Sequence, residues 1–221
     1  MRGLRQEYPG VALPDGRRSY GGNQMASPDK VMRRCGCGIV AAADLLLYLH
    51  RHHNSMPMFA GLNELPTQEE YEDLLQTLRR KYFPLFYPVG MNGISLALGL
   101  NRVFRKNSIP LCARWDMSEA KLWTRMEEML LRDVPVILSI GPNFPRLWKK
   151  GKETLYRLDN GEQQAAAATR AHYVTVTGMD EKWLRVSSWG KEYYLSRQEY
   201  EHYRADVSSA LVSNIVYIRR K

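Results

Sequence analysis

The pattern of apolar and polar positions changes near residue 132. Before it, most of the chain has helix-forming segments with apolar residues on one face; after it, short alternating or continuous apolar runs are separated by turns. The pattern predicts helices at about 37–50, 67–80, 93–106 and 118–132, and a short one after Ser196. It predicts strands at 110–115, 134–140, 154–158, 172–177, 183–189, 192–195 and 212–218. The expected fold class is therefore α+β, with a helical part followed by an antiparallel sheet.

Local signals support some of these boundaries. Thr67 and Glu70 have the spacing of a capping box, and Asn92 is a good cap for the third helix. Four alanines within 163–169 give no clear period, and we expect either a mobile excursion or a helical turn there.

The length of 221 residues suits one large domain, or at most two lobes that share a core. Residues 1–24 lack periodicity and predict an extended or disordered arm. Residues 25–221 form the expected domain, with a helical part at about 37–132 and a sheet part at about 133–221. A cleft between two such parts is a natural ligand site.

Charge and composition limit the classes of partner that we expect the protein to bind. The formal net charge is +9, but the basic residues are scattered and carry no nucleic-acid fold signature, so no specific nucleic-acid partner is expected. No apolar run reaches the ~18–20 residues that span a bilayer, and no membrane partner is expected. Three cysteines and no apolar leader favour a reducing, cytoplasmic location. The oligomeric state cannot be predicted.

Cys37 is the leading candidate for chemistry. Gly36 and Gly38 flank it, so a ligand can approach the backbone, and a largely apolar helix begins there. The N–H groups and dipole at a helix start predict a lowered thiol pKa and a nucleophilic thiolate. Cys35 is a rival nucleophile. The alternative is a small buried hydrophobe without a chemical role.

His172 is the candidate base, because it begins a predicted strand on a rigid scaffold. Ser187-Ser-Trp-Gly190 begins fifteen residues later on a neighbouring strand, and a polar side chain there can hold the imidazole tautomer, with Trp189 covering that hydrogen bond. The alternative is ordinary aromatic packing at a strand end. The main prediction includes no metal and no cofactor. A metal or redox protein is a further alternative, in which the histidines from His50 to His53 act together with Cys35 and Cys37.

These motifs resemble papain-like cysteine peptidases, including bacterial relatives with bacteriocin-processing peptidase domains. The matching pieces are Cys-Gly-Cys-Gly at 35–38, the strand 171–178, and Ser-Ser-Trp-Gly at 187–190. The resemblance implies a central Cys-bearing helix, Cys37 as nucleophile, His172 as base and Ser187 at the orienting position. It also implies a peptide or protein substrate.

Two residues depart from that pattern. Ser187 stands where the family has Asn or Asp. Val31 stands where the family has the Gln of the oxyanion hole, so Gln24 can serve beside the Cys37 N–H only if residues 25–34 fold back. We expect a cysteine peptidase or amidase that forms an acyl-enzyme. A catalytically inactive peptide-binding module stays open, and sequence does not separate a hydrolase from an acyltransferase.

Overall fold

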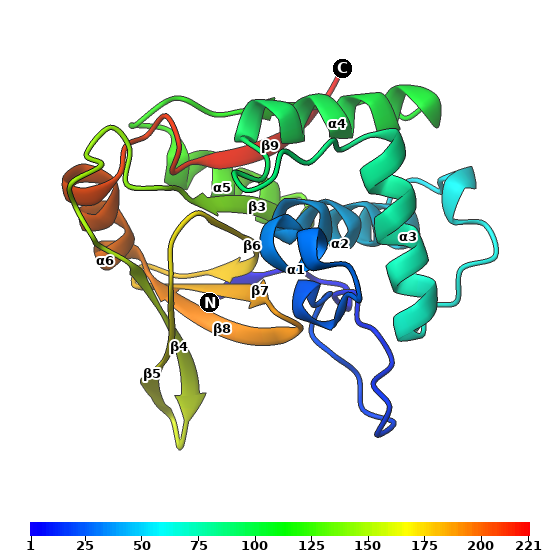
Figure 1. Ribbon diagram of the computed structural model, residues 1–221, viewed down its shortest axis with the longest axis horizontal. Helices are drawn as coiled ribbons and strands as arrows, with labels where there is room; N and C mark the ends of the chain where they lie inside the picture. Colours follow the sequence, from blue (N-terminus) through cyan, green and yellow to red (C-terminus); the bar gives the residue numbers. More distant parts are fainter.

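The computed structural model describes residues 1–221, and Figure 1 shows a group of helices packed against one curved antiparallel sheet. The predicted α+β fold, with helices before most of the sheet, is confirmed. The helices are α1 (Lys30–Cys35), α2 (Cys37–His52), α3 (Gln68–Lys81), α4 (Gly93–Lys106), α5 (Leu122–Leu131) and α6 (Arg197–His202). Short 3₁₀ turns lie at Gln24–Ala26 and Pro57–Phe59, and a π-helical turn at Tyr203–Val207.

The sheet has nine strands in the order β2-β9-β3-β6-β7-β8-β4-β5, with β1 paired to β6. The strands are β1 (Arg2–Gly3), β2 (Leu111–Trp115), β3 (Val136–Ile140), β4 (Glu153–Asp159), β5 (Glu162–Thr169), β6 (His172–Met179), β7 (Trp183–Ser188), β8 (Lys191–Ser196) and β9 (Ile215–Arg220). All pairs are antiparallel, and the hairpin β4–β5 projects from the body (Figure 1).

Helix α2 is the centre of the molecule. Every residue from Gly38 to Leu49 is buried, because the segment is apolar on all sides apart from Asp44. The helix contacts α1, α3 and α4 on one side and the strands β3 and β6 on the other. A helix surrounded in this way has its first residue held firmly against the sheet.

The N-terminal arm is ordered and extended. β1 pairs with β6, and Tyr20 N donates to Gly190 O while Gly190 N donates to Gly22 O. These bonds tie the arm to the turn between β7 and β8. The arm therefore delivers residues 22–24 to the junction of helices and sheet.

Several local predictions are confirmed and two are corrected. The capping box of Thr67 and Glu70 is present. The segment 163–169 is neither an excursion nor a helical turn but the edge strand β5, because Asn160 and Gly161 adopt positive φ and close a hairpin with β4. Helix α5 begins at Leu122 rather than 118, since Ser118 N is held by Asp116 Oδ1. No helix has the length and apolar character needed to cross a bilayer.

Candidate active site

Cys37 is the first residue of α2 and follows the single residue that separates it from α1. Gly36 N donates to Met32 O at 2.8 Å, and a Cβ at position 36 would lie 2.5 Å from that oxygen. At Gly38 a Cβ would lie 3.2 Å from the Tyr173 ring. The two glycines therefore allow the tight join between helices and the close approach of α2 to β6.

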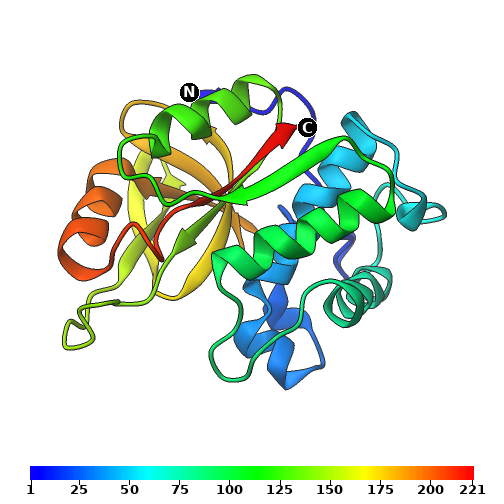
Figure 2. The same cartoon turned by 90° about the horizontal axis from the view of Figure 1, so that it is seen from above.

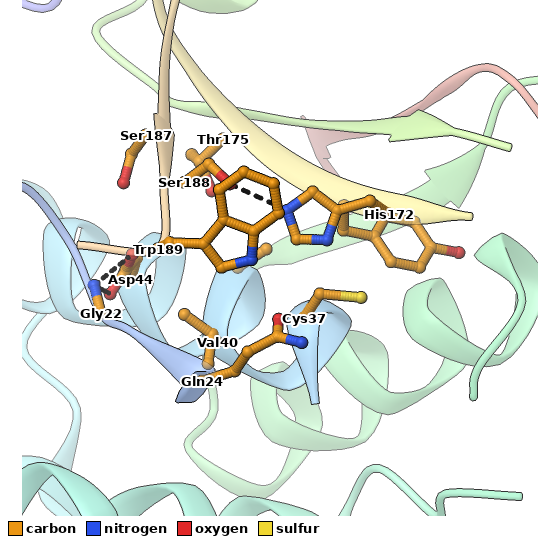
Figure 3. Close-up of a pocket in the computed structure, with 12 residues that line it drawn as sticks. Gly22, Gln24, Cys37, Val40, Asp44, His172, Thr175, Ser187, Ser188 and Trp189 are labelled. Carbon is orange, nitrogen blue, oxygen red and sulfur yellow. Dashed lines mark hydrogen bonds between the residues drawn. The ribbon is translucent and has the colours of Figure 1, made fainter. Parts of the chain in front are cut away.

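His172 begins β6 and is nearly buried, with its ring held on two sides. Its Nε2 lies 2.8 Å from Ser188 Oγ, and its ring stacks on Trp189 with centroids 4.6 Å apart and planes at 19°. Figure 3 shows the other ring nitrogen, Nδ1, on the side of Cys37. The imidazole thus has one nitrogen engaged and the other free to face the thiol.

The predicted role of Ser187 is wrong in one respect, because Ser188 makes the hydrogen bond to His172. Ser187 Oγ donates instead to Tyr20 O at 2.7 Å and so holds the N-terminal arm. Neighbouring residues on a strand point to opposite sides, so an error of one position exchanges the two partners. Trp189 does cover the imidazole as expected, and it adopts a positive φ of 49°.

Gln24 reaches the same cavity as Cys37 and His172. Helix α1 and the turn before it fold residues 25–34 back, which is the condition set from the sequence. The side chain is buried and its Nε2 donates to Arg33 O at 2.9 Å. Figure 3 places the Gln24 amide beside Cys37, so the second N–H of the amide is available at the thiol.

The pKa of the Cys37 thiol does not shift in the direction expected at the start of a helix, and the pKa of His172 is shifted as well. Burial raises the pKa of the Cys37 thiol, although the N–H groups of Tyr173 and Gly38 act in the opposite direction. Burial also lowers the pKa of His172 to about 4. The predicted lowering of the thiol pKa is therefore wrong, because desolvation outweighs the helix terminus. At neutral pH both groups are uncharged.

Asp44 is a site residue that the sequence reasoning missed. Its carboxylate accepts hydrogen bonds from Tyr71 OH at 2.7 Å, Tyr8 OH at 3.2 Å and Gly22 N at 3.0 and 3.1 Å. Burial is the main cause that raises its pKa to about 6. The signal was visible, because Asp44 lies seven residues after Cys37 on the same helix face and interrupts an apolar run.

Through Gly22, Asp44 fixes the segment that carries Gln24. Gly21 has a φ of +75°, and a Cβ there would lie 2.3 Å from Ser187 Oγ and 2.5 Å from Asp44 Oδ2. The arm therefore passes through a space that only glycine fits. Asp44 therefore helps to position Gln24, the candidate oxyanion donor, because it binds the backbone two residues before it.

A large cleft opens on the other side of Cys37. It has a volume of about 690 Å³ and lies between residues 88–94 and the strand ends near Ser139 and Tyr173. Cys37 lines both this cleft and the small cavity that holds His172. A molecule in the cleft would thus contact Cys37.

The rival thiol and the histidine cluster have other roles. Cys35 is buried, its Sγ lies 3.4 Å from Pro88 O, and burial raises its pKa. His50 accepts from Met56 N, while the rings of His52 and His53 contact backbone carbonyls. No three His, Cys, Asp or Glu side chains converge to hold a metal ion, so the geometry gives no support to the metal alternative.

Comparison with known proteins gives a likeness to a solved structure but none to a family model or a curated protein. No protein-family model matches the chain, and no curated protein matches it significantly. A crystal structure from Bacillus anthracis, described as a candidate C39-like peptidase, aligns with 96% of this chain and 98% of its own at 12% identity and a TM-score of 0.47. At this identity and TM-score the likeness assigns no activity and no family to the chain.

Proposed function

We propose that the protein is a cysteine peptidase or amidase that uses Cys37 and His172 and passes through an acyl-enzyme. The observation that carries the proposal is the arrangement of the imidazole. Its Nε2 is tied to Ser188, its face is covered by Trp189, and its Nδ1 lies on the side of a thiol that begins a buried helix. A nucleophile, a base and a group that orients the base are the parts that such chemistry requires.

The proton transfers start from a neutral Cys37 thiol and a neutral His172 imidazole. With Nε2–H donating to Ser188 Oγ, Nδ1 carries the lone pair that accepts the Cys37 proton. The sulfur then attacks the carbonyl carbon, and the imidazolium returns the proton to the leaving amine as the C–N bond breaks. In the second half, His172 takes a proton from water, the hydroxide attacks the thioester, and the Cys37 thiolate leaves and regains a proton.

The oxyanion that forms in both halves has two candidate donors. The second N–H of the Gln24 amide lies at the cavity, and Cys37 supplies its backbone N–H at the start of α2. Removal of one such donor in other enzymes costs about 3–4 kcal/mol of transition-state stabilisation. The bond from Gln24 to Arg33 O keeps this amide oriented before substrate arrives.

The large cleft supports an extended peptide or protein chain as substrate. More than half of its lining is apolar, and Arg34 and Arg170 also contribute to it. An acyl group bound there has its carbonyl next to Cys37, which also borders the cavity of His172. The acceptor in the second half is water in this proposal.

A catalytically inactive peptide-binding module is the second candidate. It is favoured by the charge state, since a neutral thiol with a raised pKa is a weaker nucleophile than a thiolate. The hydroxyl of Ser188 also orients an imidazole less firmly than a carboxylate would. The two candidates differ in turnover and share the cleft.

The deciding experiment is cleavage of a mixed peptide library, read by mass spectrometry of new termini. We expect cleavage by the parent and by Cys35→Ala, and none by Cys37→Ala or His172→Ala. An acyl adduct on Cys37 in the parent would identify the intermediate. A parent that cuts nothing but retains peptides equally well after Cys37→Ala would establish the binding module instead.

A further inference from the structure

The connection between β3 and β4, residues 142–152, is a structured loop with an anchored base. Asn143 is buried and its Nδ2 donates to Lys149 O at 2.6 Å, which closes the loop across its neck. Arg146 donates to Ser208 O at 2.6 Å and fastens the loop to the turn after α6. Figures 1 and 2 show this yellow-green loop beside α6, and in Figure 2 it projects from the edge of the molecule.

The tip of this anchored loop presents apolar side chains to solvent. Leu147 and Trp148 are each 75% exposed, and Phe144 is 44% exposed. Three large apolar residues within five positions form a knob on this projecting loop, and Phe86, Tyr87 and Val89 form a second exposed apolar group between α3 and α4. An ordered loop that exposes such residues is typical of an interaction site.

The charged residues of the loop itself all have one sign. Between Gly141 and Glu153 the loop has no acidic residue and four basic ones, namely Arg146, Lys149, Lys150 and Lys152. Glu153 is buried at the base of the loop. The adjoining turn adds one charge of each sign, from Arg204 and Asp206, so the positive excess remains. An apolar tip flanked by cations is complementary to a surface with an apolar interior and anionic headgroups.

We propose that loop 142–152 docks the protein peripherally on an anionic lipid bilayer. Leu147 and Trp148 enter the boundary between headgroups and acyl chains, where Trp is favoured, and Lys149 and Lys150 contact lipid phosphates. A projecting tip suits a deformable lipid surface, whereas a protein partner would have to offer a matching pocket. Nucleic-acid bases would stack on Trp148 and Phe144, but the aliphatic side chain of Leu147 would gain little.

This docking departs from the expectation that no membrane takes part, which came from the lack of a long apolar run. A knob of three residues is too short to raise such a signal in the sequence. The loop begins at Pro142, which also lines the large cleft. Docking would therefore bring the cleft close to the bilayer surface.

The test is co-sedimentation of the full chain with vesicles of phosphatidylcholine alone or with 30% phosphatidylserine. We expect binding to the anionic vesicles that is at least tenfold tighter than to the neutral ones and weakens at high salt. The double substitution of Leu147→Ser with Trp148→Ser should lower this binding at least tenfold. The double substitution of Lys149→Glu with Lys150→Glu should do the same.

Matched control variants test whether the loss of binding is specific to the loop or follows from any change in surface charge or exposed apolar residues. Leu98→Ser with Leu131→Ser removes two apolar residues exposed on α4 and α5, and Arg80→Glu with Lys81→Glu makes the same charge change on α3. Both controls should bind as the parent does. Absence of binding by the parent, or equal losses in the controls, would overturn the proposal. Binding of single-stranded nucleic acid through Trp148 without vesicle binding would replace it.

Discussion

His172 Nε2 lies 2.8 Å from Ser188 Oγ, and this single contact decides which nitrogen of the imidazole is available to Cys37. If Nε2 carries the proton and donates it to the hydroxyl, the lone pair is on Nδ1, the nitrogen on the Cys37 side (Figure 3). The stack on Trp189 limits rotation of the ring and excludes water from the bond.

Ser188→Ala should lower kcat by roughly five- to tenfold with little change in KM, the equivalent of one hydrogen bond of about 1 kcal/mol. The reason is loss of the preferred tautomer and ring orientation. Nitrogen NMR shifts of His172 should show a mixture of tautomers in this variant. Ser188→Thr keeps the hydroxyl and should restore the parent shifts, and Ser187→Ala should leave them unchanged. An unaltered kcat in Ser188→Ala would remove Ser188 from the mechanism.

Gln24→Ala should lower kcat by about a hundredfold or more, because it removes a donor to the developing oxyanion. KM should change less than threefold, since the ground-state carbonyl needs that donor less. Gln24→Glu has a similar shape without the N–H donor and should be no more active. The matched control is Gln164→Ala on the exposed strand β5. If KM rises by the same factor by which kcat falls, Gln24 only holds the N-terminal arm in place.

The acid limb of kcat/KM should lie near pH 4 rather than near 6.5, because burial lowers the pKa of His172 to about 4 and the neutral ring is the base. A profile from pH 3.5 to 8 on any cleaved peptide, with stability followed in parallel, would measure it. An acid limb near 6.5 would show that the ring is solvated in the working enzyme.

His172 should make the fold more stable as pH rises. Its pKa is lowered from 6.5 to about 4 on folding, so the unfolded chain binds the extra proton between these values and stability is lost as pH falls through them. The difference in unfolding free energy between the parent and His172→Ala should grow by about 3 kcal/mol from pH 4 to 7. Urea titrations at several pH values measure it; a constant difference would contradict the burial of the ring.

Asp44 should act in the opposite direction. Its pKa is raised from 3.8 to about 6, so the folded chain binds the extra proton and its contribution is lost as pH rises through that window. The free-energy difference between the parent and Asp44→Asn should shrink by about 3 kcal/mol from pH 3.5 to 6.5. In the parent, the contributions of His172 and Asp44 to the pH dependence of the unfolding free energy nearly cancel. The two opposite slopes therefore appear only when each variant is compared with the parent. The same slope in both variants would refute this account.

Much of the fold could be predicted because its elements depend on local pattern. The helix at Gly93–Lys106 was predicted at its observed bounds, since Asn92 caps it and its apolar residues have helical spacing. The strand from His172 was also found at its first residue. Strand β5 was missed because alanines on an exposed edge have no alternation, and only pairing with β4 makes them a strand.

The site was predicted less completely because its parts meet through the tertiary structure. Cys37 and His172 were visible as residue types at the ends of predicted elements. The partner of His172 was displaced by one residue, because the side of a strand that a residue faces depends on register. Asp44 stood out as an acid in an apolar helix, but its partners could not be predicted, because Gly22 and the two tyrosines meet it only in the tertiary structure.

The sequence by itself determined the order and type of most elements, the glycine-flanked thiol and the candidate base. These follow from periodicity, capping and backbone freedom, which act over a few residues. Tertiary structure decided which serine holds His172, that Gln24 folds back to Cys37, and that both reacting groups are neutral. Burial and long-range pairing control those properties, and neither can be read from neighbours along the chain.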